Sequence, residues 1–202
     1  MIAIIDYHVG NLGSVTNACK RQGMDVVVTN DPEVIRQADG IILPGVGAFP
    51  AAMSNLEACH LVPVLNEVKD KGTPILGICI GMQLLFEEGS ENGHTKGLGF
   101  LKGSVDKMEV DAKLPHMGWN QLVIKQSHPL LNYVEEGDYV YFVHSYSAHC
   151  PENQIGAYVN YGGKKITAFV YKDNVMGTQF HPEKSGEIGK KILHAFKELV
   201  SC

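Results

Sequence analysis

The chain has 202 residues, of which 45% are hydrophobic and 19% charged, and its formal net charge is -5. This balance is typical of a globular protein with a buried core, and we expect one domain over residues 1–202. The acidic charge argues against nucleic acid as a partner, and no apolar run reaches the roughly 18 residues that a membrane span needs.

The first half of the chain alternates short apolar runs with helical patterns. Strands are expected at Ile2–Asp6, Val26–Thr29, Gly40–Leu43 and Pro74–Ile78. Helices are expected at Leu12–Arg21, Pro32–Gln37, Ala48–Leu56, Leu61–Lys71 and from Gly81 to about Glu88. Near-continuous apolar strands that alternate with helices are typical of a parallel sheet covered on both faces.

The second half is dominated by strand patterns. They fall at Ser104–Val110, Asn120–Lys125, Tyr139–His144, Ile155–Asn160, Lys165–Tyr171 and Val175–Phe180. Turn residues between the last three runs indicate antiparallel hairpins, and the spacing of apolar residues predicts a closing helix over Ser185–Val200. The predicted fold is therefore α/β, with a mixed, mainly parallel central sheet, flanking helices and additional antiparallel strands.

The cysteines and the N-terminus bear on the compartment. Five cysteines are scattered along the chain without a CxxC pair, and this indicates reduced thiols rather than a disulfide framework or a zinc site. The first residues lack the basic segment and long apolar stretch of a signal peptide. We expect a cytoplasmic protein with no metal site and no cofactor.

One cysteine, Cys79, lies in the stretch Gly77-Ile78-Cys79-Ile80-Gly81 between a predicted strand and a predicted helix. A lone cysteine in an apolar run is more often a buried core residue. Here, however, the glycines have the spacing of the G-x-S-x-G nucleophile elbow, in which small neighbours let strand and helix approach. The helix that follows would favour the thiolate, and the Ile80 amide would face the oxyanion of an attacked carbonyl.

A nucleophilic thiolate needs a base, and the segment "FHPE" offers one. His181 ends a predicted strand, and Glu183 lies two residues later, where it can hold the imidazole in one tautomer. Most H-x-E triplets are a strand-end histidine beside an exposed acid. Yet both Cys79 and His181 follow strands, and sites in parallel sheets gather at the carboxyl ends of strands. The pattern predicts a Cys-His-Glu triad.

A second glycine-rich turn, Pro44-Gly45-Val46-Gly47, follows another predicted strand. It is either a tight turn that requires glycine or, beside a cysteine nucleophile, a second wall of an oxyanion hole. The histidines His8, His116 and His144 lie near these motifs, and we interpret them as hydrogen-bonded structural residues.

The stretches "GICIGMQ" and "FHPEKS" together resemble the class I (triad-type) glutamine amidotransferases, a family with a flavodoxin-like fold. The resemblance implies that the cysteine attacks the side-chain amide of glutamine and that ammonia is released to a partner site. Four further stretches, "IAIIDYHVGNLGSV", "LPGVGAFPAAM", "LPHMGWNQL" and "YFVHSY", are similar to the glutaminase subunits of imidazole glycerol phosphate synthase. The resemblance runs from residue 2 to about residue 196.

The resemblance assigns roles to individual residues. It implies a triad of Cys79, His181 and Glu183, with oxyanion amides from Ile80 and, after a backbone rearrangement, from Val46 or Gly47. The residues that it places at the glutamine substrate are Gln83, Glu91, Ser145 and Tyr146. The residues that it places at the partner interface are Asn11, Trp119 and Lys184.

The implied partner is the cyclase subunit, a (β/α)8 barrel, in a heterodimer that makes imidazole glycerol phosphate and an aminoimidazole carboxamide ribotide for histidine biosynthesis. The chain stops where a stand-alone glutaminase subunit would stop, so we expect the cyclase to be a separate protein. Two alternatives remain open. One is an amidotransferase that serves another acceptor, and the "HMGWN" and "FVHSY" stretches argue against it. The other is a catalytically idle docking subunit, which the complete triad disfavours.

Overall fold

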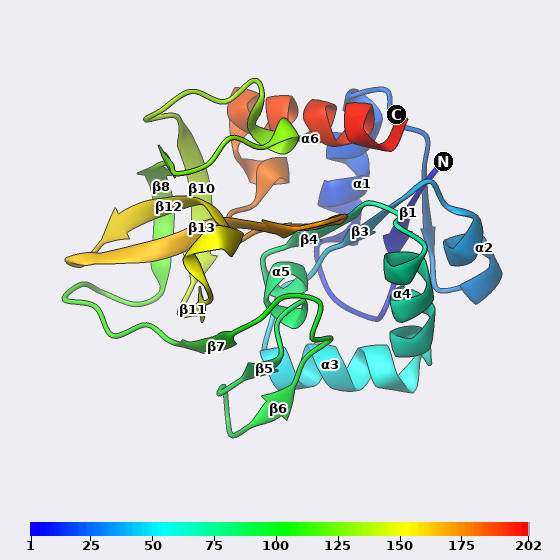
Figure 1. Cartoon of the computed structure of the whole chain (residues 1–202), viewed down its shortest axis with the longest axis horizontal. Helices are drawn as coiled ribbons and strands as arrows, with labels where there is room; N and C mark the ends of the chain where they lie inside the picture. Colours follow the sequence, from blue (N-terminus) through cyan, green and yellow to red (C-terminus); the bar gives the residue numbers. More distant parts are fainter. Residues whose placement is uncertain (202) are drawn as a thin grey trace.

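Eight strands form the central sheet of the computed structural model, which describes residues 1–201 (Figure 1). Across the sheet they follow the order β2–β1–β3–β4–β14–β13–β12–β9. Their bounds are β1 Ile2–Ile5, β2 Val26–Thr29, β3 Gly40–Leu43, β4 Ile75–Ile78, β9 Val123–Ile124, β12 Ile155–Tyr161, β13 Lys164–Lys172 and β14 Val175–Thr178.

The sheet is parallel at one end and antiparallel at the other. Strands β2, β1, β3, β4 and β14 run parallel to one another, whereas β13, β12 and β9 each pair antiparallel with the preceding strand. Every residue of β1, β3, β4 and β14 is buried, as expected of apolar strands with both faces covered. The predicted mixed, mainly parallel sheet is confirmed.

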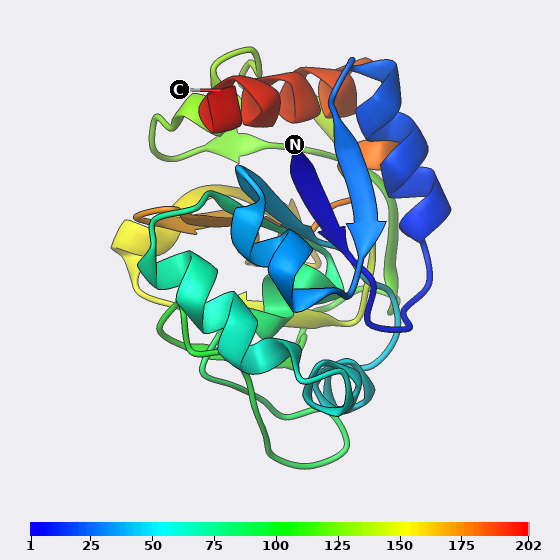
Figure 2. The ribbon, with the colours of Figure 1, turned by 90° about the vertical axis from the view of Figure 1, so that its right-hand side faces the viewer.

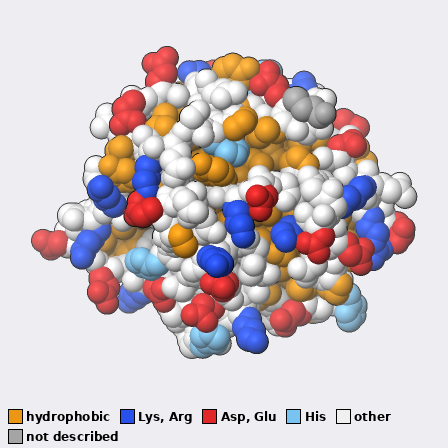
Figure 3. Space-filling view, in the orientation of Figure 1, with side chains coloured by type: hydrophobic (Ala, Val, Ile, Leu, Met, Phe, Trp, Pro, Cys, Tyr) orange, Lys and Arg blue, Asp and Glu red, His pale blue; other side chains and the backbone are white. Residues whose placement is uncertain are grey.

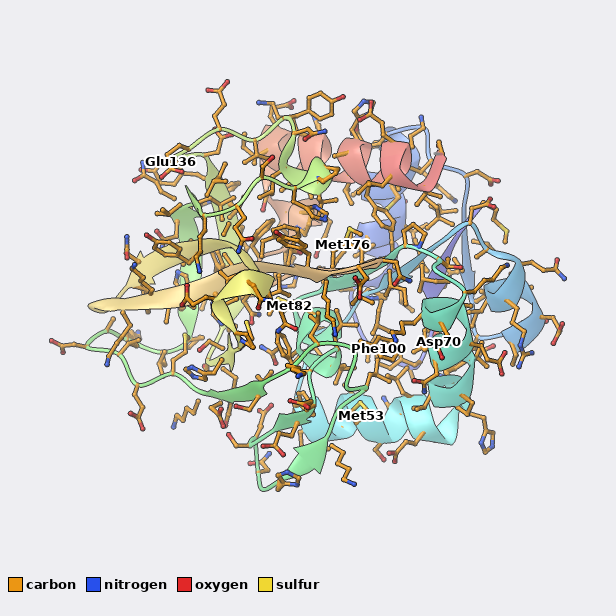
Figure 4. All side chains as sticks on the ribbon, in the orientation of Figure 1. Met53, Asp70, Met82, Phe100, Glu136 and Met176 are labelled. Carbon is orange, nitrogen blue, oxygen red and sulfur yellow. The ribbon has the colours of Figure 1, made fainter. Side chains whose placement is uncertain are left out.

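Helices cover both faces of this sheet (Figures 1 and 2). One face carries α1 (Leu12–Arg21) and α6 (Gly186–Ser201), and the other carries α3 (Phe49–Ala58), α4 (Leu61–Asp70) and α5 (Ile80–Leu84), with α2 (Pro32–Gln37) beside α4. Each face has its own apolar cluster. Figure 4 shows Met176 on one side of the sheet and Met82 on the other, with Met53 and Phe100 further out beyond Met82.

Two smaller sheets lie beside the central one. In the first, β8 (His116–Gln121) pairs antiparallel with β10 (Tyr139–His144), and we call this pair the β8–β10 ribbon. The second contains β11 (Tyr146–His149), β7 (Ser104–Lys107), β5 (Glu88–Gly89) and β6 (Thr95–Lys96). Short 3-10 turns lie at Pro129–Leu131, Glu152–Gln154 and Pro182–Lys184.

The segment after Cys79 departs from the prediction. The helix ends at Leu84, not near Glu88, because a later segment takes the carbonyl groups that a longer helix would use. Leu98 N–H donates to Leu84 O at 2.8 Å, and Gly99 N–H donates to Phe86 O at 3.0 Å. Tertiary pairing thus replaces the helical pattern here.

The region around residue 120 also differs from the prediction. The single predicted strand Asn120–Lys125 is two strands, β8 and β9, separated by Leu122, and β8 begins earlier, at His116. The predicted strand Tyr139–His144 matches β10, but β11 follows it after one residue and joins a different sheet.

On the face shown in Figure 3, charge of neither sign is concentrated in one patch. Acidic and basic side chains are interspersed over the face shown in Figure 3. Within residues 1–201 no helix has the length and apolar character to cross a membrane.

Candidate active site

Four neighbouring parallel strands bring the candidate residues together. Because β1, β3, β4 and β14 are adjacent and parallel, the loops that follow them meet at one edge of the sheet. These loops carry Asn11, the turn Pro44–Gly47, Cys79 and the segment His181–Lys184. Because β4 and β14 are neighbours, the sheet order places Cys79 next to the segment His181–Lys184.

Cys79 lies at a sharp turn between β4 and α5. Its backbone has φ 54° and ψ -109°, which non-glycine residues rarely adopt. A Cβ atom on Gly81 would lie 1.7 Å from the carbonyl oxygen of Leu43, and one on Gly77 would lie 2.7 Å from the Gly81 backbone. Both glycines therefore permit the close packing of strand and helix that a nucleophile elbow requires.

His181 and Glu183 form a buried pair beside Cys79. His181 Nδ1 lies 2.7 Å from Glu183 Oε1, and both side chains are fully buried. Glu183 also accepts a hydrogen bond from the side-chain amide of Asn11. Among the residues 1–201, no hydrogen-bond partner reaches His181 Nε2, so this nitrogen remains available for a reacting group.

Burial and charge act in opposite directions on this pair. Burial disfavours the charged imidazole, but the neighbouring Cys79 and Glu183 raise the pKa of His181 to about 9. Burial also opposes ionisation of Glu183, but hydrogen bonds from His181 and Asn11 hold its pKa below the ordinary value. At neutral pH the pair is an imidazolium and a carboxylate, so His181 holds a proton that it can donate.

A pocket of about 330 Å³ opens beside Cys79. The predicted residues that line it are Val46, Gly47, Cys79, Ile80, Gln83, Glu91, Ser145 and Tyr146. Pro115, Val143 and His144 complete the wall. The carboxylate of Glu91 accepts the Phe49 N–H at 2.9 Å, at the first residue of α3. Residues 1–201 contain no cluster of His, Cys, Asp or Glu that could hold a metal ion.

Behind the pocket-lining residue Gln83 lies a second glutamine, Gln179, which the sequence did not predict. Gln83 Nε2 donates to Gln179 Oε1 at 3.0 Å, and Gln179 Nε2 lies 3.8 Å from Cys79 Sγ. Gln179 is fully buried. The signal that could have found it is an amide side chain within the apolar segment "VMGTQF", since a buried polar group requires partners.

The side chain of Tyr7 supports the Pro44–Gly47 turn by a hydrogen bond. The buried hydroxyl of Tyr7 donates to the Pro44 carbonyl at 2.5 Å. Gly10, in the same loop as Tyr7, packs so closely that a Cβ on it would lie 2.9 Å from a methyl group of Val46. The loop after β1 therefore contacts both this turn and, through Asn11, the carboxylate of Glu183.

Large apolar side chains are exposed on the outer side of the β8–β10 ribbon. Met117, Trp119 and Tyr139 are each more than half exposed, at 61%, 54% and 51%. Of the three predicted interface residues, Trp119 lies on this surface and Lys184 is exposed directly after Glu183. Asn11 is half-buried and reaches inward to Glu183.

The fold and the arrangement at Cys79 define the class of protein. The chain belongs to the class-I glutamine amidotransferase family, whose model matches residues 3–199. A solved structure described as a glutamine amidotransferase superposes with a TM-score of 0.77 at 17% identity, covering 100% of both chains, and supports the fold.

Curated relatives narrow the family. The chain is 54% identical to the imidazole glycerol phosphate synthase subunit HisH of Lactococcus lactis subsp. lactis (strain IL1403), covering 98% of each. It is 53% identical to the HisH subunit of Bacillus cereus (strain G9842), covering 100% of this chain and 96% of the relative. Over nearly its whole length the chain is therefore similar to HisH subunits.

Proposed function

We propose that this chain hydrolyses glutamine with Cys79, His181 and Glu183 and passes the ammonia to the cyclase subunit of an imidazole glycerol phosphate synthase. The observation that carries the proposal is the buried His181–Glu183 pair beside Cys79 at a nucleophile elbow that opens into one pocket. The 54% identity to a HisH subunit supports both the reaction and the acceptor pathway, histidine biosynthesis.

In the first half-reaction the Cys79 thiolate attacks the side-chain carboxamide carbon of glutamine. Backbone amides of Ile80 and of Val46 or Gly47 hold the oxyanion, the latter pair once the turn presents an N–H to it. His181 gives its proton to the departing nitrogen, and the carbon–nitrogen bond breaks. Ammonia leaves, and a γ-glutamyl thioester remains on Cys79.

In the second half-reaction His181, now neutral, takes a proton from a water molecule. The hydroxide attacks the thioester carbonyl through the same oxyanion site, and the carbon–sulfur bond breaks. The product leaves as the γ-carboxylic acid and loses its proton to solvent to give glutamate, and the thiolate–imidazolium pair is restored. Glu183 accepts the Nδ1–H of His181 throughout and so directs Nε2 to the reacting atoms.

The rest of the pocket matches the two charged groups on the α-carbon of the substrate. Glu91 supplies a negative charge for the α-amino group, and the backbone at Ser145 and Tyr146 receives the α-carboxylate. Gln83, one turn into α5, binds the glutamine substrate. All four residues line the pocket that contains Cys79.

The exposed ribbon supports a docking role. Free ammonia is protonated and lost in water, so a partner must cover its exit. Trp119 and its exposed neighbours on the β8–β10 ribbon offer an apolar surface of the kind that anchors interfaces. We assign this surface, with Lys184 and Asn11 beside it, to a cyclase subunit with a (β/α)8 barrel, in a cytoplasmic heterodimer.

The experiment that tests the proposal is glutamate release from glutamine, with and without the cyclase subunit and its ribonucleotide ligand. Cys79→Ala is expected to lower the rate at least about a thousandfold, because the nucleophile is lost, while partner binding is retained. Cys59→Ala, which changes a half-buried thiol elsewhere, is the control and is expected to keep full activity.

The outcomes separate the alternatives. Hydrolysis that persists in Cys79→Ala would contradict the mechanism. Wild-type hydrolysis that is high alone and indifferent to the cyclase would instead favour an amidotransferase for another acceptor. A wild-type complex without hydrolysis would favour an idle docking subunit.

A further inference from the structure

Two buried histidines outside the triad are hydrogen-bonded to each other. His116 on β8 and His144 on β10 face each other in the register of the ribbon, on its inner side. His116 Nδ1 lies 3.0 Å from His144 Nε2. The His116 ring also stacks on the rings of Phe142 and Tyr161, with centroid distances of 4.6 and 4.0 Å. This packing holds both imidazoles in place.

The partners at the two ends fix the direction of the hydrogen bonds. His144 Nδ1 lies 2.7 Å from the Tyr146 carbonyl, which only accepts, so this nitrogen carries the proton. Burial lowers the pKa of His144 to about 3 and that of His116 to about 4, so both rings are neutral at pH 7. His144 Nε2 must then accept, and His116 Nδ1 must donate.

The other nitrogen of His116 confirms this direction. His116 Nε2 accepts from the side-chain amide of Asn120 at 3.3 Å. The orientation of that amide is fixed, since its oxygen accepts the Gln121 N–H at 2.8 Å and its nitrogen also donates to the Asn160 carbonyl at 3.0 Å. Every donor in the chain of bonds therefore points from Asn120 toward Tyr146.

The chain of bonds ends in the pocket beside Cys79. The Tyr146 carbonyl also accepts from Gln83 Nε2, at 3.3 Å. Gln83 in turn contacts Gln179, which reaches the sulfur of Cys79. At its other end Asn120 follows Trp119 on β8, whose ring lies on the outer side of the ribbon. The network thus joins the exposed ribbon to Gln83, which lines the pocket.

We propose that His116 and His144 are positioning residues. From the inner side of the ribbon, these two neutral rings form a hydrogen-bonded relay that fixes the Tyr146 carbonyl, and through it holds Gln83 in the position that binds glutamine. The relay rests on the proposed function only in naming glutamine as the ligand. It assigns a role in substrate binding to two histidines that the sequence alone indicated as structural.

The first test reads the tautomers directly. In long-range proton–nitrogen NMR spectra of the full chain with 15N-labelled histidine at pH 7, both His116 and His144 are expected to carry hydrogen on Nδ1 and none on Nε2. Asn120→Asp replaces the amide donor by a carboxylate of the same shape that only accepts, so His116 Nε2 is expected to gain a proton. An Nε2–H form of either ring in the wild type, or an unchanged His116 in Asn120→Asp, would overturn the relay.

The second test measures its effect on glutamine. In the complex with the cyclase subunit, His116→Phe keeps an aromatic ring but leaves His144 Nε2 without its donor. We expect KM for glutamine to rise about tenfold, with kcat within about threefold of wild type. His128→Phe is the matched control, since His128 is also a buried neutral histidine packed on aromatic rings, and its variant should keep KM within about twofold.

Equal KM values in the two variants would overturn the proposal. The two proposals fail separately. A wild-type complex that does not hydrolyse glutamine would remove the proposed function, while the NMR spectra would still decide whether the relay exists.

Discussion

At the residue scale, the strained backbone of Cys79 is held by its surroundings rather than by its own preference. The positive φ angle of this residue costs on the order of 1–3 kcal/mol and persists because β4 and α5 pack against each other through two glycines. The same packing points the thiol into the pocket next to His181. Strain and reactivity therefore have one structural origin.

The raised pKa of His181 predicts the alkaline limb of the pH profile. Its proton is needed by the departing ammonia, so kcat/KM is expected to fall as the pH rises through about 9. The folded-state pKa of His181 lies above the ordinary value of 6.5. The stabilisation from the His181–Glu183 ion pair is therefore complete below about pH 6.5 and is lost as the pH rises through about 9.

Glu183→Gln tests whether the carboxylate of Glu183 contributes to the raised pKa of His181. Glutamine keeps an oxygen acceptor for His181 but removes the negative charge, so the alkaline limb should move to lower pH, and kcat should fall. The measurement is kcat/KM for glutamine in the complex between pH 6 and 10. Identical limbs in wild type and variant would show that the carboxylate does not set the pKa.

The triad could be predicted from the sequence because each motif carries its own local signature, a glycine elbow or an H-P-E segment. The partners that support the triad could not. Tyr7 meets the Pro44 carbonyl 37 residues away in the chain, and Gln83 meets Gln179 at a separation of 96. A buried polar residue can be recognised in a sequence, but the residue that satisfies it depends on the tertiary fold.

At the scale of elements, the contact between the elbow helix and β3 is the tightest in the site. In Gly81→Ala the new Cβ would lie 1.7 Å from a backbone oxygen, so the free energy of unfolding should fall by about 3 kcal/mol or more, with loss of hydrolysis. Gly13→Ala is the control, because nothing lies within 4 Å of the new Cβ in α1. In this variant the free energy of unfolding should rise by about 0.5 kcal/mol. Urea unfolding measures both, and equal effects would show that close packing at Gly81 is not required.

Element boundaries were predictable where local pattern and tertiary pairing agree. The parallel strands and their helices meet this condition. The segment from Leu84 to Leu101 does not, because its backbone pairs with itself in a compact loop that a helical pattern conceals. Likewise Gly118 disfavours a strand, yet β8 runs through it because β10 supplies a full antiparallel partner.

At the scale of the whole molecule, the exposed ribbon predicts the site of association. Trp119→Ala should weaken binding of the cyclase subunit about thirtyfold, or about 2 kcal/mol, because a central exposed tryptophan carries a large share of an interface. Stability of the isolated chain should change by less than about 1 kcal/mol. Tyr133→Ala, which alters an exposed aromatic residue that bonds to Glu198, is the control. Titration calorimetry measures both, and equal affinities would place the interface elsewhere.

The order of strands in the sheet has a consequence for the newly made chain. The ribosome completes Cys79 long before Gln179, which follows it by 100 residues, and before the histidine two positions further on. Moreover, β14 sits in the middle of the sheet, between β4 and β13, although it is the last strand to be synthesised. A nascent chain that has passed Cys79 but has not reached His181 therefore carries a thiol without its base and an incomplete sheet, and it cannot hydrolyse glutamine until β14 and the residues after it have been made.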